Sequence, residues 1–176
     1  MTLAVKISSL LVLALAGISA AGAQGNVVNE MGKPPGNFPI PSNAKLELSL
    51  KTNKKKYSDT DVIRINFTVK NKGKEEATLS FPDGQKYDFE LRKGKDMKAE
   101  KVWQFSKGRM SIMVFTSAKI APSKELVFKE SYKAGETGGD GKELPKLTAG
   151  MYSLTGILRT AGRTPRPTKT ITFQVK

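Results

Sequence analysis

The chain has 176 residues, no histidine, no cysteine and a formal net charge of +14 at pH 7. A Ser-His-Asp triad, a cysteine nucleophile and a zinc site of the usual kind are therefore excluded. Its sixteen acidic residues mostly alternate with lysines and lack the ligand spacing of a calcium loop. We predict a protein that binds a partner, is not an enzyme and uses no cofactor or metal.

The first 23 residues have the pattern of a signal peptide. Lys6 precedes an apolar run over 10–18, and small residues end at Ala23, which places the cleavage before Gln24. The run is shorter than the roughly 20 residues that span a bilayer, so we expect no stable membrane insertion. This pattern predicts an exported protein, periplasmic or extracellular, and export makes nucleic acid an unexpected partner.

Residues 24–43 contain four prolines and three glycines among polar residues. This composition is typical of a flexible linker. Residues 44–176 are long enough for one domain with a core of its own. We expect that domain to be a monomer.

The domain alternates apolar and polar residues with a period of two, which is typical of strands with one buried face. Glycine, proline and asparagine turns separate these segments, and residues 134–146 form a glycine-rich polar loop. We predict an all-β fold, an immunoglobulin-like antiparallel β-sandwich of about 8–9 strands. The predicted strands are 46–50, 63–69, 79–81, 87–91, 102–105, 112–115, 126–132, 152–158 and 171–175.

Residues 79–91, LSFPDGQKYDFEL, join two alternating segments through Pro82-Asp83-Gly84. Proline, aspartate and glycine in this order suit a type I turn, so the segment is predicted as a β-hairpin. Tyr87 and Phe89 are expected on the buried face, and Asp88 on the exposed face.

Tyr152 follows the short turn LTAGM at the start of a predicted strand. Two interpretations remain open. In one, its hydroxyl bonds back to the backbone of the turn as a tyrosine corner; in the other, Tyr152 is an ordinary core residue.

The motifs FPDGQKYDFEL, VWQFSKGRM, IAPSKELVFKESYK and LTAGMYSLTGIL follow one another between about residues 70 and 160. Together they resemble the BsuPI domain family, which is named for a Bacillus intracellular proteinase inhibitor. The resemblance implies an immunoglobulin-like β-sandwich and inhibition of serine proteinases. The shared residues are mostly apolar or turn-forming, so they identify the fold more directly than a site.

An inhibitor presents a rigid loop to a proteinase, because pre-organisation lowers the cost of binding. Of two candidate loops, the segment after VWQF is expected to be the more rigid, because strands flank it, and 134–146 the more flexible. The predicted contact residues are Lys107, Gly108, Arg109 and Met110.

The alternative function is a non-inhibitory, immunoglobulin-like binding module of the cell envelope. Its basic surface would hold an anionic polymer or an acidic protein partner. Exposed charges of this kind also serve solubility alone. The residues of this predicted patch are Lys54, Lys55, Lys56, Arg159, Arg163 and Arg166.

Overall fold

The computed structural model describes residues 45–96, 98–161 and 166–176. The predicted signal peptide, its cleavage site at Ala23 and Gln24, the linker and Arg163 lie outside these residues. The regular structure of the described residues is all β, which confirms the predicted class. Ten strands follow in chain order: β1 (Leu46–Thr52), β2 (Lys56–Tyr57), β3 (Ile63–Asn71), β4 (Ala77–Phe81), β5 (Tyr87–Lys93), β6 (Lys101–Gln104), β7 (Thr116–Ile120), β8 (Glu125–Tyr132), β9 (Gly150–Leu158) and β10 (Thr168–Val175).

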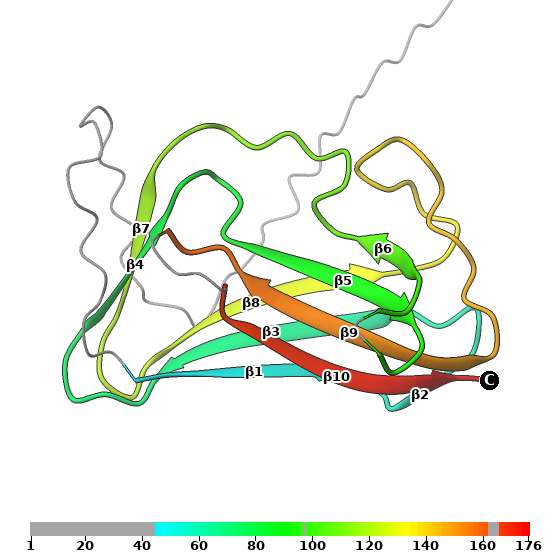
Figure 1. Cartoon of the computed structure of the whole chain (residues 1–176), viewed down its shortest axis with the longest axis horizontal. Helices are drawn as coiled ribbons and strands as arrows, with labels where there is room; N and C mark the ends of the chain where they lie inside the picture. Colours follow the sequence, from blue (N-terminus) through cyan, green and yellow to red (C-terminus); the bar gives the residue numbers. More distant parts are fainter. Residues whose placement is uncertain (1–44, 97, 162–165) are drawn as a thin grey trace, which may run out of the picture.

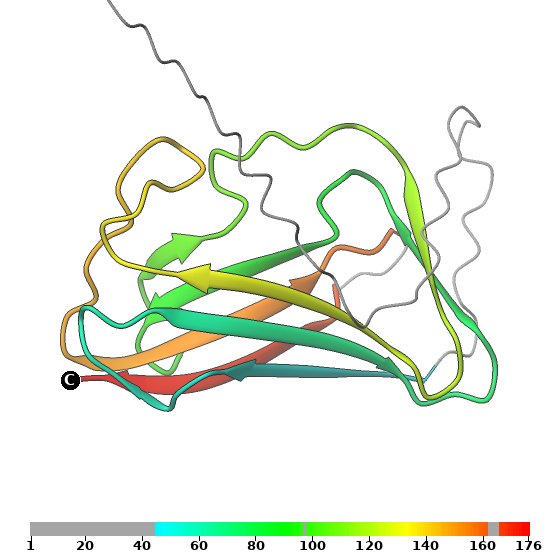
Figure 2. The same cartoon turned by 180° about the vertical axis from the view of Figure 1, so that it is seen from behind.

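The strands form three sheets, with the orders β1-β3-β8, β2-β10-β9-β5-β6 and β4-β7. All pairs are antiparallel except β2 with β10, which is parallel. Figure 1 shows the three-stranded sheet behind the five-stranded sheet, and the β4-β7 pair at one end of both. Figure 2 shows the same layers from behind, with β3 and β8 toward the viewer.

The core lies between the two larger sheets, because each turns its apolar face inward. In β3, buried and more exposed residues alternate along the whole strand, as the period of two predicts. The rings of Phe67 and Phe89, from opposite sheets, meet edge to face with centroids 6.0 Å apart. Tyr152 is buried and stacks on Phe173. Its hydroxyl donates to the carbonyl of Thr148 at 2.9 Å, which is the geometry of a tyrosine corner.

The predicted hairpin over residues 79–91 is wrong. β4 pairs with β7, and β5 pairs with β6 and β9, so the chain passes from one sheet to another at Pro82–Gly84. The alternation of both flanking segments is correct, but alternation reports which face is buried and not which strand is the neighbour. The turn residues change the direction of the chain without pairing the strands beside them.

The described residues contain no helix with the length and hydropathy of a membrane span. They also contain no group of three or more acidic residues placed to hold a metal ion.

Candidate functional site

The segment between β6 and β7 exposes a run of large apolar side chains. The exposed fractions are 95% for Met110, 74% for Ile112, 86% for Met113 and 42% for Phe115. The predicted strand at 112–115 is therefore wrong: these residues lie outside any strand and toward solvent. A contiguous exposed apolar run marks a site of interaction with another molecule.

Backbone hydrogen bonds fix the middle of this segment. The carbonyl of Ile112 accepts from the amide of Gly84 at 2.9 Å and from the amide of Val114 at 2.8 Å. The second bond spans two residues, so it closes a γ-turn with Met113 at its centre. The turn at Pro82–Gly84 thus holds the carbonyl just before Met113.

That turn is itself held by Arg159, which follows β9. The Arg159 guanidinium donates to Gln85 Oε1 at 2.8 Å and to Asp83 Oδ2 at 3.3 Å. The Arg159 amide also donates to the carbonyl of Lys86 at 2.9 Å. Arg159 was predicted to hold an anionic partner, but its guanidinium already binds groups of the protein itself.

Asp88 holds the start of the same segment. Its Oδ1 accepts from the amides of Phe89 and Ser106 at 2.9 and 3.0 Å, and its Oδ2 accepts from Gln104 Nε2 and Ser106 Oγ, both at 2.7 Å. Asp88 is only 4% exposed, so its predicted place on the exposed face is wrong. No sequence pattern indicates this role, because Asp88 alternates with apolar residues as the neighbouring Glu90 does.

The two candidate loops pack against each other through glycines. A Cβ on Gly108 would lie 2.2 Å from Asp140 Cα, and a Cβ on Gly139 would lie 2.4 Å from Arg109 Cγ. Gly108 also has a φ of 72°, which glycine adopts without strain. Lys107 Nζ lies 3.4 Å from Asp140 Oδ2. The amide of Lys142 and then the Lys107 ammonium lower the pKa of Asp140.

The loop over 134–146 is folded on itself, contrary to the prediction of a floppy loop. Gly135 donates to the carbonyl of Leu144 at 2.9 Å, and Leu144 donates to that of Glu136 at 2.8 Å. The amide of Gly138 also donates to the carbonyl of Lys142 at 2.7 Å. The Tyr132 hydroxyl donates to the carbonyl of Pro145 and fixes the far end. In Figure 1 this loop lies beside the segment that follows β6.

A hollow of about 410 Å³ lies beneath the exposed segment, between Gly84–Tyr87 and Phe105–Ile112. At its floor the Tyr87 hydroxyl donates to Glu130. Burial and the Glu130 carboxylate raise the pKa of Tyr87 well above its ordinary value. The Arg109 guanidinium lies 4.0 Å from the centroid of the Phe105 ring. Arg109 is therefore packed on the domain, whereas Met110 and Met113 project freely.

The structure does not bring the predicted basic patch together. Lys56 lies beside Gln174, near the Gly150 end of β9, whereas Arg159 follows the opposite end of that strand. Lys54 forms an ion pair with Asp61 at 2.6 Å. The predicted patch thus divides into a group at 54–56 and a group at the Arg159 end, where Arg166 is exposed.

The fold and the site together define a β-sheet domain that presents a braced, apolar loop. The BsuPI family model, described as intracellular proteinase inhibitor, matches residues 50–163. The chain belongs to this family, as its motifs indicated. A family of proteinase inhibitors implies a binding protein with a proteinase as its partner. No curated protein matches the chain.

Three solved structures illustrate the similarity to larger proteins. The sporulation control protein Spo0M of Bacillus subtilis is 18% identical, with a TM-score of 0.45 over 76% of this chain and 50% of that protein. A β-glucosidase of Erythrobacter marinus is 12% identical, with a TM-score of 0.42 over 76% and 16%. The Pseudomonas fluorescens DNA glycosylase AlkC is 10% identical, with a TM-score of 0.41 over 76% and 31%. At these TM-scores the likenesses carry no functional argument.

The family description contradicts the predicted location. An exported protein, periplasmic or extracellular, was predicted from residues 1–23, whereas the matching family is described as intracellular. The prediction of export used only the apolar run and the small residues of this segment, and such a pattern measures hydropathy and not location. The segment itself lies outside the described residues.

Proposed function

We propose that this protein inhibits a serine proteinase by inserting the segment 106–115 into the cleft of the enzyme. One observation carries the proposal: large apolar side chains stand in solvent on a backbone that the domain holds in place. A few anchor residues carry most of the energy of a protein interface, and methionine is enriched in interfaces. A backbone that is already ordered loses little entropy on binding, which favours tight and slowly reversed association.

The predicted contact residues Lys107, Gly108, Arg109 and Met110 form the first half of this segment. The second half, with Ile112 and Met113, extends the contact. We propose Met110 and Met113 as the anchors, because they are the most exposed large apolar side chains of the described residues. Arg109 packs on Phe105, so an apolar specificity pocket fits this segment better than an acidic one.

Titration of the full chain against a subtilisin-like and a trypsin-like proteinase tests the proposal. Stoichiometric inhibition that is insensitive to salt is expected with the subtilisin-like enzyme. The double substitution Met110→Ser, Met113→Ser should weaken inhibition by about a hundredfold, since each anchor contributes about 1–2 kcal/mol.

The triple substitution Lys54, Lys55, Lys56→Ser is the matched control, because it also changes exposed side chains but far from the segment. It should leave inhibition unchanged. Rapid cleavage of the chain by both enzymes, without inhibition of either, would reject the proposal.

The immunoglobulin-like class of the sandwich is also proposed, on the support of two facing antiparallel sheets and the tyrosine corner at Tyr152. The alternative function, binding of an anionic polymer through the predicted basic patch, stays a prediction. The use of Arg159 and Lys54 in contacts within the protein does not favour it.

A further inference from the structure

The outer face of the β1-β3-β8 sheet carries an uneven distribution of charge. Near one end, the register places Glu47, Lys70 and Glu125 side by side, so a cation lies between two carboxylates. Near the other end, the register places Lys51, Asn66 and Lys129 side by side, so two cations flank a neutral amide. The two ends of one face therefore differ in sign.

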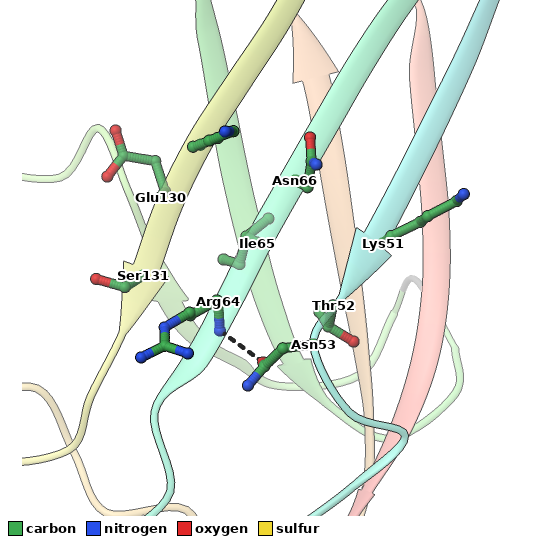
Figure 3. Close-up of a pocket in the computed structure, with 9 residues that line it drawn as sticks. Lys51, Thr52, Asn53, Arg64, Ile65, Asn66, Glu130 and Ser131 are labelled. Carbon is green, nitrogen blue, oxygen red and sulfur yellow. Dashed lines mark hydrogen bonds between the residues drawn. The ribbon is translucent and has the colours of Figure 1, made fainter. Parts of the chain in front are cut away.

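Arg64 adds a third cation to the positive end. It lies two residues from Asn66 on the central strand, opposite Ser131 of β8. Its amide donates to Asn53 Oδ1 at 2.9 Å, the bond drawn in Figure 3. Arg64 itself is exposed. Among the described residues, none of the three cations forms an ion pair with a carboxylate.

Glu130 is the carboxylate nearest to these cations in sequence, and among the described residues it forms no ion pair with them. It pairs in register with the buried Ile65, so it belongs to the inner face of the sheet. There it accepts the hydroxyl proton of Tyr87 in a hydrogen bond.

The positive end is also hollowed. A cavity of about 570 Å³ opens there, which is within the usual size of small-molecule sites. Figure 3 shows its lining side chains on β1, β3 and β8, with Asn66 between the flanking strands. The lining residues are Lys51, Thr52, Asn53, Arg64, Asn66, Lys129 and Ser131, together with Ile65 and Glu130, which belong to the inner face by register but also reach the hollow.

We propose that this hollow binds a small compound carrying a diphosphate group. Lys51 and Lys129 lie two strand spacings apart, roughly 10 Å, with Arg64 roughly 7 Å along the central strand. Arginine binds phosphate oxygens through two parallel hydrogen bonds, and lysine binds them as a point charge. Three cations match the charge of a diphosphate, and Asn66 and Ser131 offer neutral donors to its remaining oxygens.

Two features of the face favour a small anion over a macromolecule. The rows around the hollow present Val127 as their apolar side chain and no aromatic ring, so stacking of nucleic-acid bases has no platform. An apolar anchor for a protein interface is missing there as well. In Figure 3 the Lys51 side chain points away from Asn66, and exposed side chains of this kind change rotamer within nanoseconds.

Isothermal titration calorimetry of the full chain with pyrophosphate, at about 0.15 M ionic strength, tests this inference. One-to-one binding is expected. Arg64→Gln and Lys129→Gln should each weaken it by about tenfold, since each removes one charged contact. Lys70→Gln is the matched control, because it removes the same charge from the same face at the balanced end. It should change the affinity by less than about twofold.

A nucleoside diphosphate in a second titration distinguishes the sources of the group. Equal affinity for both compounds identifies the diphosphate alone as the ligand, and tighter binding of the nucleoside diphosphate identifies an organic phosphate; both results support the site. The inference is overturned if about 1 mM pyrophosphate produces no saturable heat. It is also overturned if Lys70→Gln weakens binding as much as Arg64→Gln, because binding would then follow net charge. Proteinase inhibition does not enter this test.

Discussion

The aromatic residues beneath the segment 106–115 and the apolar residues along it have similar hydropathy and opposite environments. Phe89 is 0% exposed and Phe105 is 8% exposed, whereas Met110 and Met113 are almost fully exposed. Burial stabilises the fold by about 1.5–3 kcal/mol for each large apolar side chain. The inner group therefore stabilises the fold, and Met110 and Met113 contribute little to its stability. Folding does not explain why the outer apolar side chains are present, and contact with a partner does.

Substitution of the inner group should have the largest effect. Phe89→Asp buries a carboxylate without a partner among Phe67, Tyr87 and Phe105, which contact its ring. The loss of about 5 kcal/mol or more exceeds the stability margin of many domains of this size. Circular dichroism should show an unfolded chain at 25 °C. A folded Phe89→Asp variant with the original melting temperature would contradict the assignment of this residue to the core.

The connection between the inner and outer groups depends on Asp88. Asp88→Ala should destabilise the protein by about 4 kcal/mol, because several donors then lose a charged acceptor in a buried place. Denaturant unfolding measures this loss. Asp96→Ala is the control: this exposed carboxylate accepts one bond from Lys98, so its loss should cost less than about 0.5 kcal/mol. Similar values for the two variants would show that Asp88 does not hold the segment.

The contact between the two loops is tested by a pair of glycines with similar backbone angles. Gly108 and Gly135 have φ values of 72° and 79°, so alanine is strained at both. Only at Gly108 would the new Cβ also meet the backbone of Asp140. We expect a loss of about 3 kcal/mol for Gly108→Ala and about 1 kcal/mol for Gly135→Ala. Hydrogen exchange over 138–142 should rise more in Gly108→Ala than in Gly135→Ala, and equal exchange in both variants would argue against interlocked loops.

Stability should fall in alkaline solution because of buried tyrosines. Burial raises the pKa of Tyr132 above 10.0, and burial together with Glu130 does the same for Tyr87. The folded state thus holds these protons more tightly than the unfolded state. Their contribution is complete below pH 10 and decreases as the pH rises above it, by at most about 1.4 kcal/mol per pH unit for each tyrosine.

Denaturant unfolding from about pH 9 to about pH 11 measures this slope. Tyr132→Phe is the control, since it removes one titrating hydroxyl together with its bond to Pro145. The variant should be less stable at neutral pH and show a shallower alkaline slope. An identical slope in the variant would mean that Tyr132 does not contribute to the loss.

The sequence predicts the buried faces well, because a period of two reports burial directly. β3 and β10 follow the predicted alternation, and Tyr152 lies where a tyrosine corner requires it. Pairing of strands is a different matter, because it depends on contacts between segments far apart in the chain. The turn at Pro82–Gly84 joins two sheets for this reason, although its composition is that of a hairpin.

The predicted contact residues stay a prediction, and the structure adds to them the apolar residues that follow in the same segment. Lys107–Met110 were chosen because a loop follows an aromatic strand, and they do lie in the exposed segment. Ile112 to Phe115 were assigned to a strand, since an apolar run is expected to be buried. The bracing by Asp88 and Gly108 depends on partners that lie 18 and 32 residues away along the chain. No local pattern encodes such partners.

The smallest effect on stability should come from the outer group itself. Met110→Ser and Met113→Ser remove side chains that are 95% and 86% exposed, so each should change the free energy of unfolding by less than about 0.5 kcal/mol. Denaturant unfolding of the full chain checks this, with Phe105→Ser as the buried comparison, expected to cost about 3–4 kcal/mol. A loss above about 1 kcal/mol in either methionine variant would mean that the segment packs on the domain in solution. In that case these side chains would serve folding, and their exposure would no longer call for a partner.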